Sequence, residues 1–149
     1  MLEGVPHQVS KFREADVVKP QGRGAAGIAG IKLSDQAQAI AFGVAKAEVE
    51  NIAITAANNS NALAGTDAGS IKVTALEEFP AKGRATGGVR AQKFIRNEDQ
   101  LYFAWVGAVD PIALTADGKP TDLPAELSKR DASGSKAAAQ LGAIGHRLS

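Results

Sequence analysis

The sequence carries the stretch KGRATGGVRAQKF at residues 82–94 and a related stretch, QGRGAAGIAGIKL, 61 positions earlier at residues 21–33. Each contains a Gly-Arg pair in a glycine-rich turn and continues into a run with strand character. Outward from these stretches, the same offset aligns Lys11 with Lys72. Self-similarity at a fixed offset indicates that the chain is built from repeats.

Large apolar residues recur at every second position in both copies. The two rows are Ile40, Phe42 and Val44, and Leu101, Phe103 and Trp105. A period of two places each row on one face of a β-strand. Residues 34–52 are rich in Ala, Gln, Glu and Lys and also fit a capped helix, but the aromatic residues of the aligned second copy favour a strand.

Further strand-like runs lie between turns rich in Gly, Pro and Asn. They span residues 8–13, 28–33, 51–56, 70–75 and 88–94. Short strands at regular spacing predict an all-β fold, a propeller-like array of antiparallel four-stranded units. Each unit has an apolar face that it buries by stacking on its neighbours.

The repeat suggests a division of the chain into three parts. We expect a first repeat at residues 1–61, a second at residues 62–109 and a C-terminal extension at residues 110–149. Within the extension, residues 123–130 are expected to form a short helix. Residues 131–149 are rich in Ser, Gly and Ala, so we expect a flexible, partly disordered tail.

Composition narrows the class of protein. The 149 residues include no cysteine, which excludes disulfides, and the longest apolar stretch, residues 39–45, is too short to span a bilayer. The first six residues lack the basic and apolar regions of a signal peptide. The net charge is +1, from 17 basic and 16 acidic side chains. A nucleic-acid partner must therefore be argued from where the cations lie.

The two Gly-Arg turns and the strands that follow them resemble the repeat of a known domain. This is the C-terminal domain of the A subunit of bacterial type IIA DNA topoisomerases, gyrase and topoisomerase IV, which folds as a β-pinwheel. The resemblance covers residues 9–107 and implies a partial β-pinwheel, a fragment of about two blades. The first turn is similar to the gyrase-A box, Gln-Arg-Arg-Gly-Gly-Lys-Gly. Gly22 replaces an arginine of that box and Ala26 its lysine, which favours an ordinary blade or a topoisomerase IV-like paralogue.

The resemblance implies a sequence-tolerant module that binds and wraps double-stranded DNA and has no catalytic centre of its own. Its partners would be duplex DNA, the B subunit, and the remainder of the A subunit, with no membrane, in a cytoplasmic, nucleoid-associated enzyme. ATP and Mg²⁺ would belong to the rest of the holoenzyme, so no cofactor or metal is expected in this chain. Tyr102, the one tyrosine, is expected to be a strand residue and not a DNA-cleaving nucleophile.

Duplex DNA that follows the rim of such an array would be held by Lys and Arg contacts to phosphates, without base readout. Glycine beside arginine lets the backbone approach a phosphate closely. The candidate DNA-binding residues are Arg23, Arg84, Lys32, Lys93, Arg90 and Arg96, with Gly22, Gly24 and Gly83. A second group of candidates comprises Lys11, Lys19, Lys72 and Lys82. Alternatively, the lysines only solvate outer strand faces, and the arginines pair with Asp16 or Glu77.

Two other classes of function remain open. One is a β-repeat scaffold that binds a protein partner, which the near-neutral charge favours. The other is a small nucleotide-dependent enzyme, because residues 22–27 fit G-x-G-x-x-G. That motif needs a strand before it and a helix after it, but Pro20 precedes the first glycine and Ala85 breaks the pattern in the second copy. His7 and His146 lack metal-ligand spacing.

Overall fold

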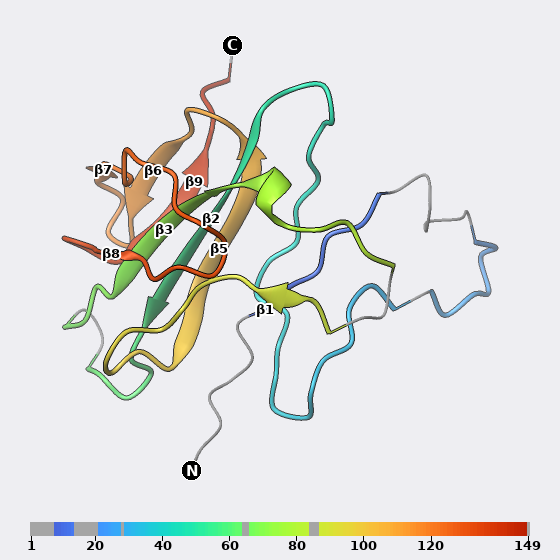
Figure 1. Cartoon of the computed structure of the whole chain (residues 1–149), viewed down its shortest axis with the longest axis horizontal. Helices are drawn as coiled ribbons and strands as arrows, with labels where there is room; N and C mark the ends of the chain where they lie inside the picture. The colour runs from blue at the N-terminus through green and yellow to red at the C-terminus, as the bar shows by residue number, and fades with distance from the viewer. Residues whose placement is uncertain (1–7, 14–20, 28, 64–65, 84–86, 149) are drawn as a thin grey trace.

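The computed structural model describes residues 8–13, 21–27, 29–63, 66–83 and 87–148 (Figure 1). In chain order its elements are β1 (Gln8–Val9), β2 (Asn51–Asn58), β3 (Ser70–Ala75), the 3-10 helix η1 (Leu76–Glu78), β4 (Val89–Arg90), β5 (Gln100–Ala108), β6 (Ile112–Thr115), β7 (Pro120–Thr121), β8 (Ser135–Lys136) and β9 (Leu141–Gly145). Apart from the single turn of η1, the regular structure of the described residues is β, which confirms the predicted class. Across these ranges the structure contains no helix with the length and hydrophobicity that a membrane crossing requires.

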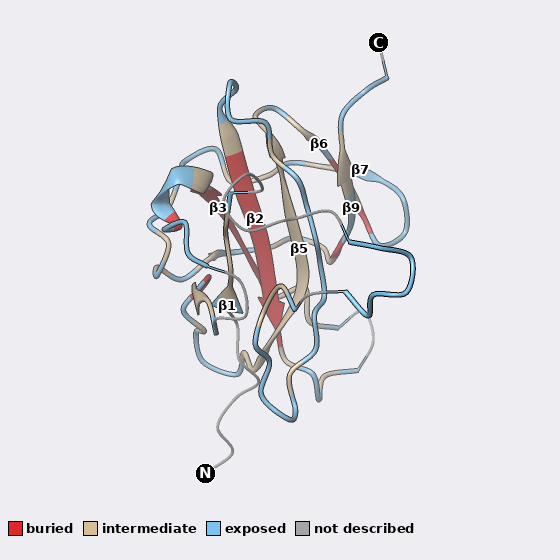
Figure 2. Ribbon diagram, turned by 90° about the vertical axis from the view of Figure 1, so that its right-hand side faces the viewer, coloured by how far each residue is buried: buried red, intermediate tan, exposed pale blue. Residues whose placement is uncertain are grey.

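The strands form three antiparallel sheets. Their strand orders are β1-β4, β5-β2-β3-β8 and β7-β6-β9. The centre of the largest sheet is β2, which is buried along almost its whole length (Figure 2). Strands β2, β3 and β5 confirm three of the predicted runs, and β5 extends its run as far as Ala108.

One face of the four-stranded sheet forms the apolar core. Its buried residues on β2 and β3 alternate with those of the opposite face, as a strand period of two requires. They are Ile52, Ile54, Ala56, Ile71 and Val73, and they pack with Ala113 and Leu141 of the three-stranded sheet. The core is therefore built where two sheets meet, and Trp105 and Tyr102 of β5 pack against its margin.

The opposite face of the same sheet is buried too, and it combines polar residues with a small apolar cluster in which Ala53 packs with Phe79 and Ala91. The segment that contains β4 covers the polar part. Thr55 Oγ1 donates a hydrogen bond to Gln92 Oε1 at 2.7 Å, and Gln92 Nε2 donates to Ser70 Oγ at 2.9 Å. Ser70 in turn donates to a carboxylate oxygen of Glu98 at 2.5 Å. These bonds satisfy buried polar groups that would otherwise oppose folding.

The C-terminal residues are not a flexible tail. Strand β8 pairs with β3, β9 pairs with β6, and Leu141 of β9 is only 3% exposed. The expectation of a flexible, partly disordered tail is therefore wrong for residues 135–145, which contain β8 and β9. Residues 123–130 also form no helix. The Ser128 N–H bonds the Val73 carbonyl of β3 at 2.8 Å, so it is not available for a hydrogen bond within a helix.

The three-stranded sheet reproduces the pattern of the larger sheet. The central strands β2 and β6 each pair with the strand that follows them and with a later strand, β5 or β9. In these later pairings Ile52 lies opposite Gly107, and Ile112 lies opposite Gly145. We therefore distinguish three successive units: the first unit (residues 8–13, 21–27 and 29–47), the second unit (β2 to β5) and the third unit (β6 to β9).

Strand pairing also connects neighbouring units. Strand β4 of the second unit pairs with β1 of the first, and β8 of the third unit pairs with β3 of the second. The division at residue 61 expected from the sequence does not separate the sheets, because β2 lies before it and pairs with β3 and β5 after it. The units are thus linked through their backbones as well as through side-chain packing.

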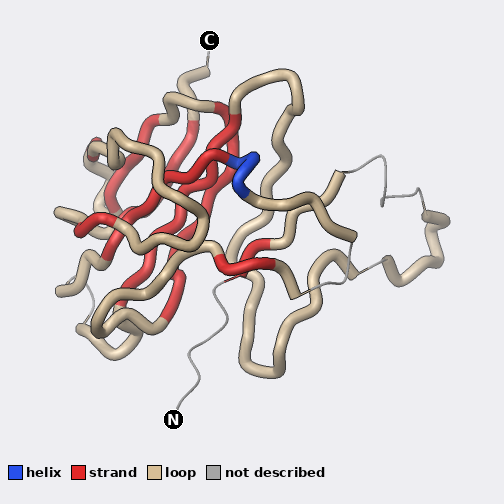
Figure 3. The backbone as a smooth tube through the Cα atoms, in the orientation of Figure 1, coloured by secondary structure: helices blue, strands red, loops and turns tan. Residues whose placement is uncertain are grey.

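The first unit departs from the predicted strands. Residues 37–46 form no strand, and Phe42 and Val44 are 88% and 78% exposed. Figure 3 shows the strands gathered on one side of the molecule and the long loops on the other. In the second unit the row of Leu101, Phe103 and Trp105 is ordered by pairing with β2. Within the described residues, no strand plays that role for residues 40–44, so the expected strand there is wrong.

Candidate nucleic-acid interface

The first Gly-Arg turn projects away from the sheets. Residues 21–27 lie in the blue loop on the right of Figure 1. Arg23 is exposed in a turn that the Ala25 N–H closes on the Gly22 carbonyl at 3.1 Å. A side chain at Gly22 or Gly24 would meet no atom of the described residues within 4 Å, so packing within that part of the chain does not require either glycine. The turn is open on the outside, as a contact to a large ligand requires.

The second Gly-Arg turn is only partly described. Gly83 is exposed, and a side chain there would also meet no atom within 4 Å in the part of the chain that the structure describes. Arg84 lies outside the described residues, as do Lys19 and Asp16. The alternative in which Asp16 or Glu77 pairs with these arginines therefore stays a prediction.

The other candidate cations are exposed on two different units. Lys32 lies on the first unit. Arg90 lies on β4, opposite Gln8, and Lys93 follows three residues later, with its N–H bonded to the Ala132 carbonyl at 2.9 Å. Arg96 lies in a turn closed by a 3.0 Å bond from the Glu98 N–H to the Ile95 carbonyl. The structure thus brings Arg90 and Lys93 to the boundary between the second and third units.

Sequence reasoning missed two cations at that boundary. A turn at residues 129–132 is closed by a 3.1 Å bond from the Ala132 N–H to the Lys129 carbonyl. Arg130 Nη1 donates to the Arg90 carbonyl at 2.7 Å, and Lys129 is exposed beside it. We call Arg90, Lys93, Lys129 and Arg130 the basic junction. The sequence signal for the two missed cations was the Lys-Arg pair at residues 129–130, which stands in a stretch without the alternating apolar pattern of a strand.

Two lysines of the second candidate group do not face solvent freely. Lys72 is buried, and its Nζ donates to the Lys129 carbonyl at 3.1 Å and to the Arg130 carbonyl. Burial lowers its pKa to about 8, with Asp131 acting in the opposite direction. The expectation that Lys72 contacts phosphate is therefore wrong. Lys11 is half-buried and donates to the Leu76 carbonyl at 3.0 Å, and burial also lowers its pKa.

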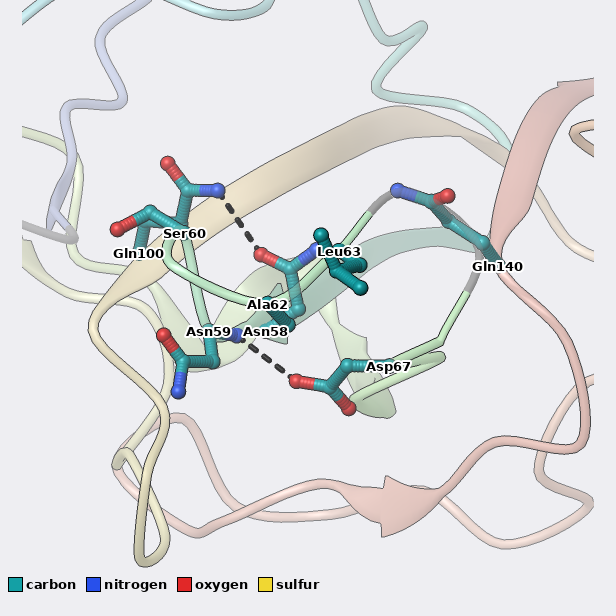
Figure 4. Close-up of a pocket in the computed structure, with 8 residues that line it drawn as sticks. All are labelled: Asn58, Asn59, Ser60, Ala62, Leu63, Asp67, Gln100 and Gln140. Atoms are coloured by element: carbon teal, nitrogen blue, oxygen red, sulfur yellow. Dashed lines mark hydrogen bonds between the residues drawn. The ribbon is translucent and has the colours of Figure 1, made fainter.

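A polar depression of about 190 Å³ lies beside the loop that joins β2 to β3 (Figure 4). Gln100 Nε2 donates to Asn58 Oδ1 at 2.9 Å, and the Asp67 carboxylate accepts the N–H groups of Asn59 at 3.0 Å and Gly69 at 2.9 Å. These polar groups bond one another and hold the loop in place. Their chemistry is that of a structured turn.

The nucleotide alternative finds no support in the first turn. The G-x-G-x-x-G pattern binds pyrophosphate only when a helix opens directly after it, because the helix N-terminus supplies the N–H groups. Residues 29–33, which follow the motif among the described residues, form no helix. Tyr102 is the strand residue that the sequence predicted: it lies in β5, and its hydroxyl accepts the Leu141 N–H at 3.0 Å.

Comparison with known proteins agrees with the repeat architecture. The sequence profile of the family described as DNA gyrase C-terminal domain, beta-propeller, matches residues 9–45 and 61–99, a little more than half of the chain. The chain is also similar to a DNA gyrase A subunit from Klebsiella oxytoca, with 32% identity over 118 residues. That alignment covers 78% of this chain but 12% of the relative. The chain belongs to the DNA gyrase C-terminal domain family, and its all-β fold is a partial β-pinwheel.

Proposed function

We propose that this chain is a sequence-tolerant module that binds duplex DNA as part of a type IIA topoisomerase A subunit. The observation that carries the proposal is the basic junction, where Arg90 and Lys93 of the second unit lie beside Lys129 and Arg130 of the third. Membership of the gyrase family supports duplex DNA as the ligand.

Cations grouped at the boundary of two units are suited to a phosphate backbone. Contacts to phosphate position a protein on DNA without reading its sequence, and each contact releases condensed counterions. Arg90, Lys93 and Lys129 are exposed, and Arg130 is half-exposed. The near-neutral net charge of the whole chain is no obstacle, because the local arrangement of charge governs the encounter.

The remaining steps of such an enzyme would lie outside this chain. DNA wrapping would help to set the path of the duplex for strand passage. DNA cleavage, ATP hydrolysis and the Mg²⁺ chemistry would belong to the B subunit or to the rest of the A subunit. In this proposal the chain acts in the cytoplasm, at the nucleoid, as a binding module without a catalytic centre.

The proposal is tested by fluorescence anisotropy with a labelled duplex at several salt concentrations. We expect saturable binding that weakens as salt rises, and equal competition by unlabelled duplexes of unrelated sequence. Binding that one sequence alone displaces would contradict a backbone-directed mode. If the chain does not bind the duplex even at low salt, DNA is not its ligand.

One observation favours a second candidate, a scaffold for a protein partner. Phe42 and Val44 form an exposed apolar row on the first unit. Apolar surface that stands open in this way marks interaction sites in many soluble proteins. If this reading holds, Phe42→Ser abolishes capture of the partner, while the charge-removing variants at Arg90 and Lys93 leave it intact.

A further inference from the structure

Lys72 is a buried cation that lies beneath the basic junction and not within it. It stands on β3 directly opposite Thr55 of β2, and 1% of its surface is exposed. Burying an ammonium group opposes folding unless hydrogen bonds replace its water. Two carbonyl oxygens do so here, those of Lys129 and Arg130. Both belong to the turn that presents the Arg130 side chain.

That turn is held from two directions. On the β3 side, the Lys72 ammonium donates to the carbonyls of Lys129 and Arg130, and the Ser128 N–H bonds the carbonyl of Val73, also on β3, at 2.8 Å. On the β4 side, the guanidinium of Arg130 donates to the Arg90 carbonyl at 2.7 Å. The side-chain amine of Lys72 is therefore the buried contact that ties the turn to β3.

The charges that face Lys72 come from two segments, the turn at residues 129–132 and the 3-10 helix η1. Asp131 of the turn and Glu78 of η1 favour the ammonium form, whereas Arg130 and burial oppose it. A neutral amine still carries two N–H donors, enough for two carbonyls. The contact can therefore survive loss of the charge, so geometry and not charge defines its role.

The first unit repeats the arrangement. Lys11 precedes Lys72 by the 61-residue offset of the repeat, and its Nζ bonds the Leu76 carbonyl of the following unit at 3.0 Å. The Lys82 N–H completes that boundary with a 2.7 Å bond to the Lys11 carbonyl. At both boundaries, then, a lysine side chain reaches a backbone carbonyl of the next unit: Lys72 from β3, and Lys11 from just after β1.

We infer that Lys72 is a positioning residue for DNA binding: by holding the carbonyls of Lys129 and Arg130, it fixes the turn that aims the Arg130 guanidinium beside Arg90 and Lys93. The inference rests on the proposed DNA-binding function. It assigns Lys72 no contact with DNA, since its ammonium is covered by the turn.

The first test is independent of DNA and compares amide hydrogen exchange in the wild type and in Lys72→Met. The amides of Lys93 and Ser128 bond across the boundary, whereas Ile54 lies in the centre of the core. We expect faster exchange at Lys93 and Ser128, by roughly tenfold, with Ile54 unchanged, because local opening need not involve the core. Lys119→Met is the matched control: Lys119 is exposed, and its Nζ lies 3.4 Å from the Oδ2 atom of its neighbour Asp117, so the change removes a lysine that is not at this boundary.

The second test is a double-mutant cycle on the affinity for a labelled duplex. Lys72→Met should weaken binding by roughly threefold or more in the wild-type background and have little effect when Arg130 is already alanine, because coupled residues are not additive. A role in stability alone would lower affinity equally in both backgrounds. Equal losses would therefore overturn the inference.

The two tests separate the inference from the proposed function. If the wild type does not bind DNA, the proposed function fails, and faster exchange at Lys93 and Ser128 would still show that Lys72 holds the turn. Unchanged exchange at those amides in a folded Lys72→Met variant overturns the positioning role. Lys72→Gln, which retains two N–H donors, is the second variant; if both variants unfold, Lys72 belongs to the fold alone and the inference fails.

Discussion

The carbonyl oxygen of Arg90 accepts a 2.7 Å hydrogen bond from the guanidinium of Arg130, 40 positions later in the chain. Arg90 lies on β4 of the second unit, and Arg130 lies in a turn of the third. The bond uses only part of the guanidinium, which has five N–H donors. In the proposed function, the remaining donors would bind a DNA phosphate. The two arginines therefore lie next to each other although they belong to different units.

Removing two cations of the basic junction should weaken DNA binding and reduce its salt dependence. Because each phosphate contact contributes about 0.9 to the slope of log K against log salt, Arg90→Ala with Lys93→Ala should lower the magnitude of that slope by about 1.8. Anisotropy titrations between low and moderate salt measure it. The matched control is Lys46→Ala with Lys119→Ala, which removes two exposed lysines elsewhere. An unchanged slope in the junction variant would exclude Arg90 and Lys93 from the interface.

The stability of the protein should depend on pH through Lys72. Burial lowers its pKa from 10.5 to about 8. Between these two values the unfolded chain holds a proton that the folded chain has lost, so the free energy of unfolding rises with pH. Urea unfolding at pH 7.5 and at pH 10 should show the wild type gaining stability relative to Lys72→Met. Below pH 8 the difference between the two should not vary with pH on account of this group. If the difference in the free energy of unfolding between the wild type and Lys72→Met is the same at pH 7.5 and at pH 10, the burial of the ammonium is contradicted.

Two glycines at equivalent positions of the repeat should respond differently to alanine. Gly27 and Gly88 both have positive φ, 87° and 75°, which alanine adopts at a cost of about 1 kcal/mol. At Gly88 the added Cβ would also lie 2.6 Å from the Val9 carbonyl oxygen, whereas at Gly27 it would meet none of the described atoms within 4 Å. Gly88→Ala should therefore lower the free energy of unfolding by about 2–3 kcal/mol, and Gly27→Ala by about 1 kcal/mol. Equal losses in thermal or urea unfolding would mean that β1 and β4 do not approach closely.

The exposed apolar row of the first unit should promote self-association. Phe42 and Val44 lie on a segment that passes beside the edge strand β5: a Cβ on Gly43 would be 3.2 Å from that of Val106. Exposed apolar segments at a sheet edge are common sites of pairing between chains. Sedimentation velocity over a range of protein concentrations should show larger species for the wild type than for Phe42→Ser with Val44→Thr. A monomeric wild type at high concentration would contradict this expectation.

The strands of the second unit could be predicted because their signals agree. Ile52, Ile54, Ile71 and Val73 are β-branched and recur with a period of two, and each pair lies on one buried face. The turn signals at Asn58 and Gly69 then delimit β2 and β3. Local preference and tertiary packing favour the same structure there, so sequence reasoning succeeded.

The errors arose where structure depends on a partner far away in the chain. Residues 40–44 have the alternation of a strand, but a strand forms only where another strand pairs with it. Conversely, β9 is a short, glycine-containing stretch with little signal of its own, and it is ordered by pairing with β6. Such pairing is not encoded in any short window of sequence.

The candidate site was predictable only in part for the same reason. Arg90 and Lys93 were found because they follow a repeated turn. Arg130 was missed because its position beside Arg90 depends on how the third unit docks on the second. Lys72 was misplaced because its strand position suggested an outer face, whereas the turn that covers it lies 57 and 58 positions later.

The slope of log K against log salt for duplex binding by the wild-type chain tests the central claim most directly. If the four cations of the basic junction contact phosphates, the slope should be about −3.6 or steeper, and it should be the same for duplexes of unrelated sequence. A slope near zero, or no binding at low salt, would contradict the account and leave the protein-binding scaffold as the better description.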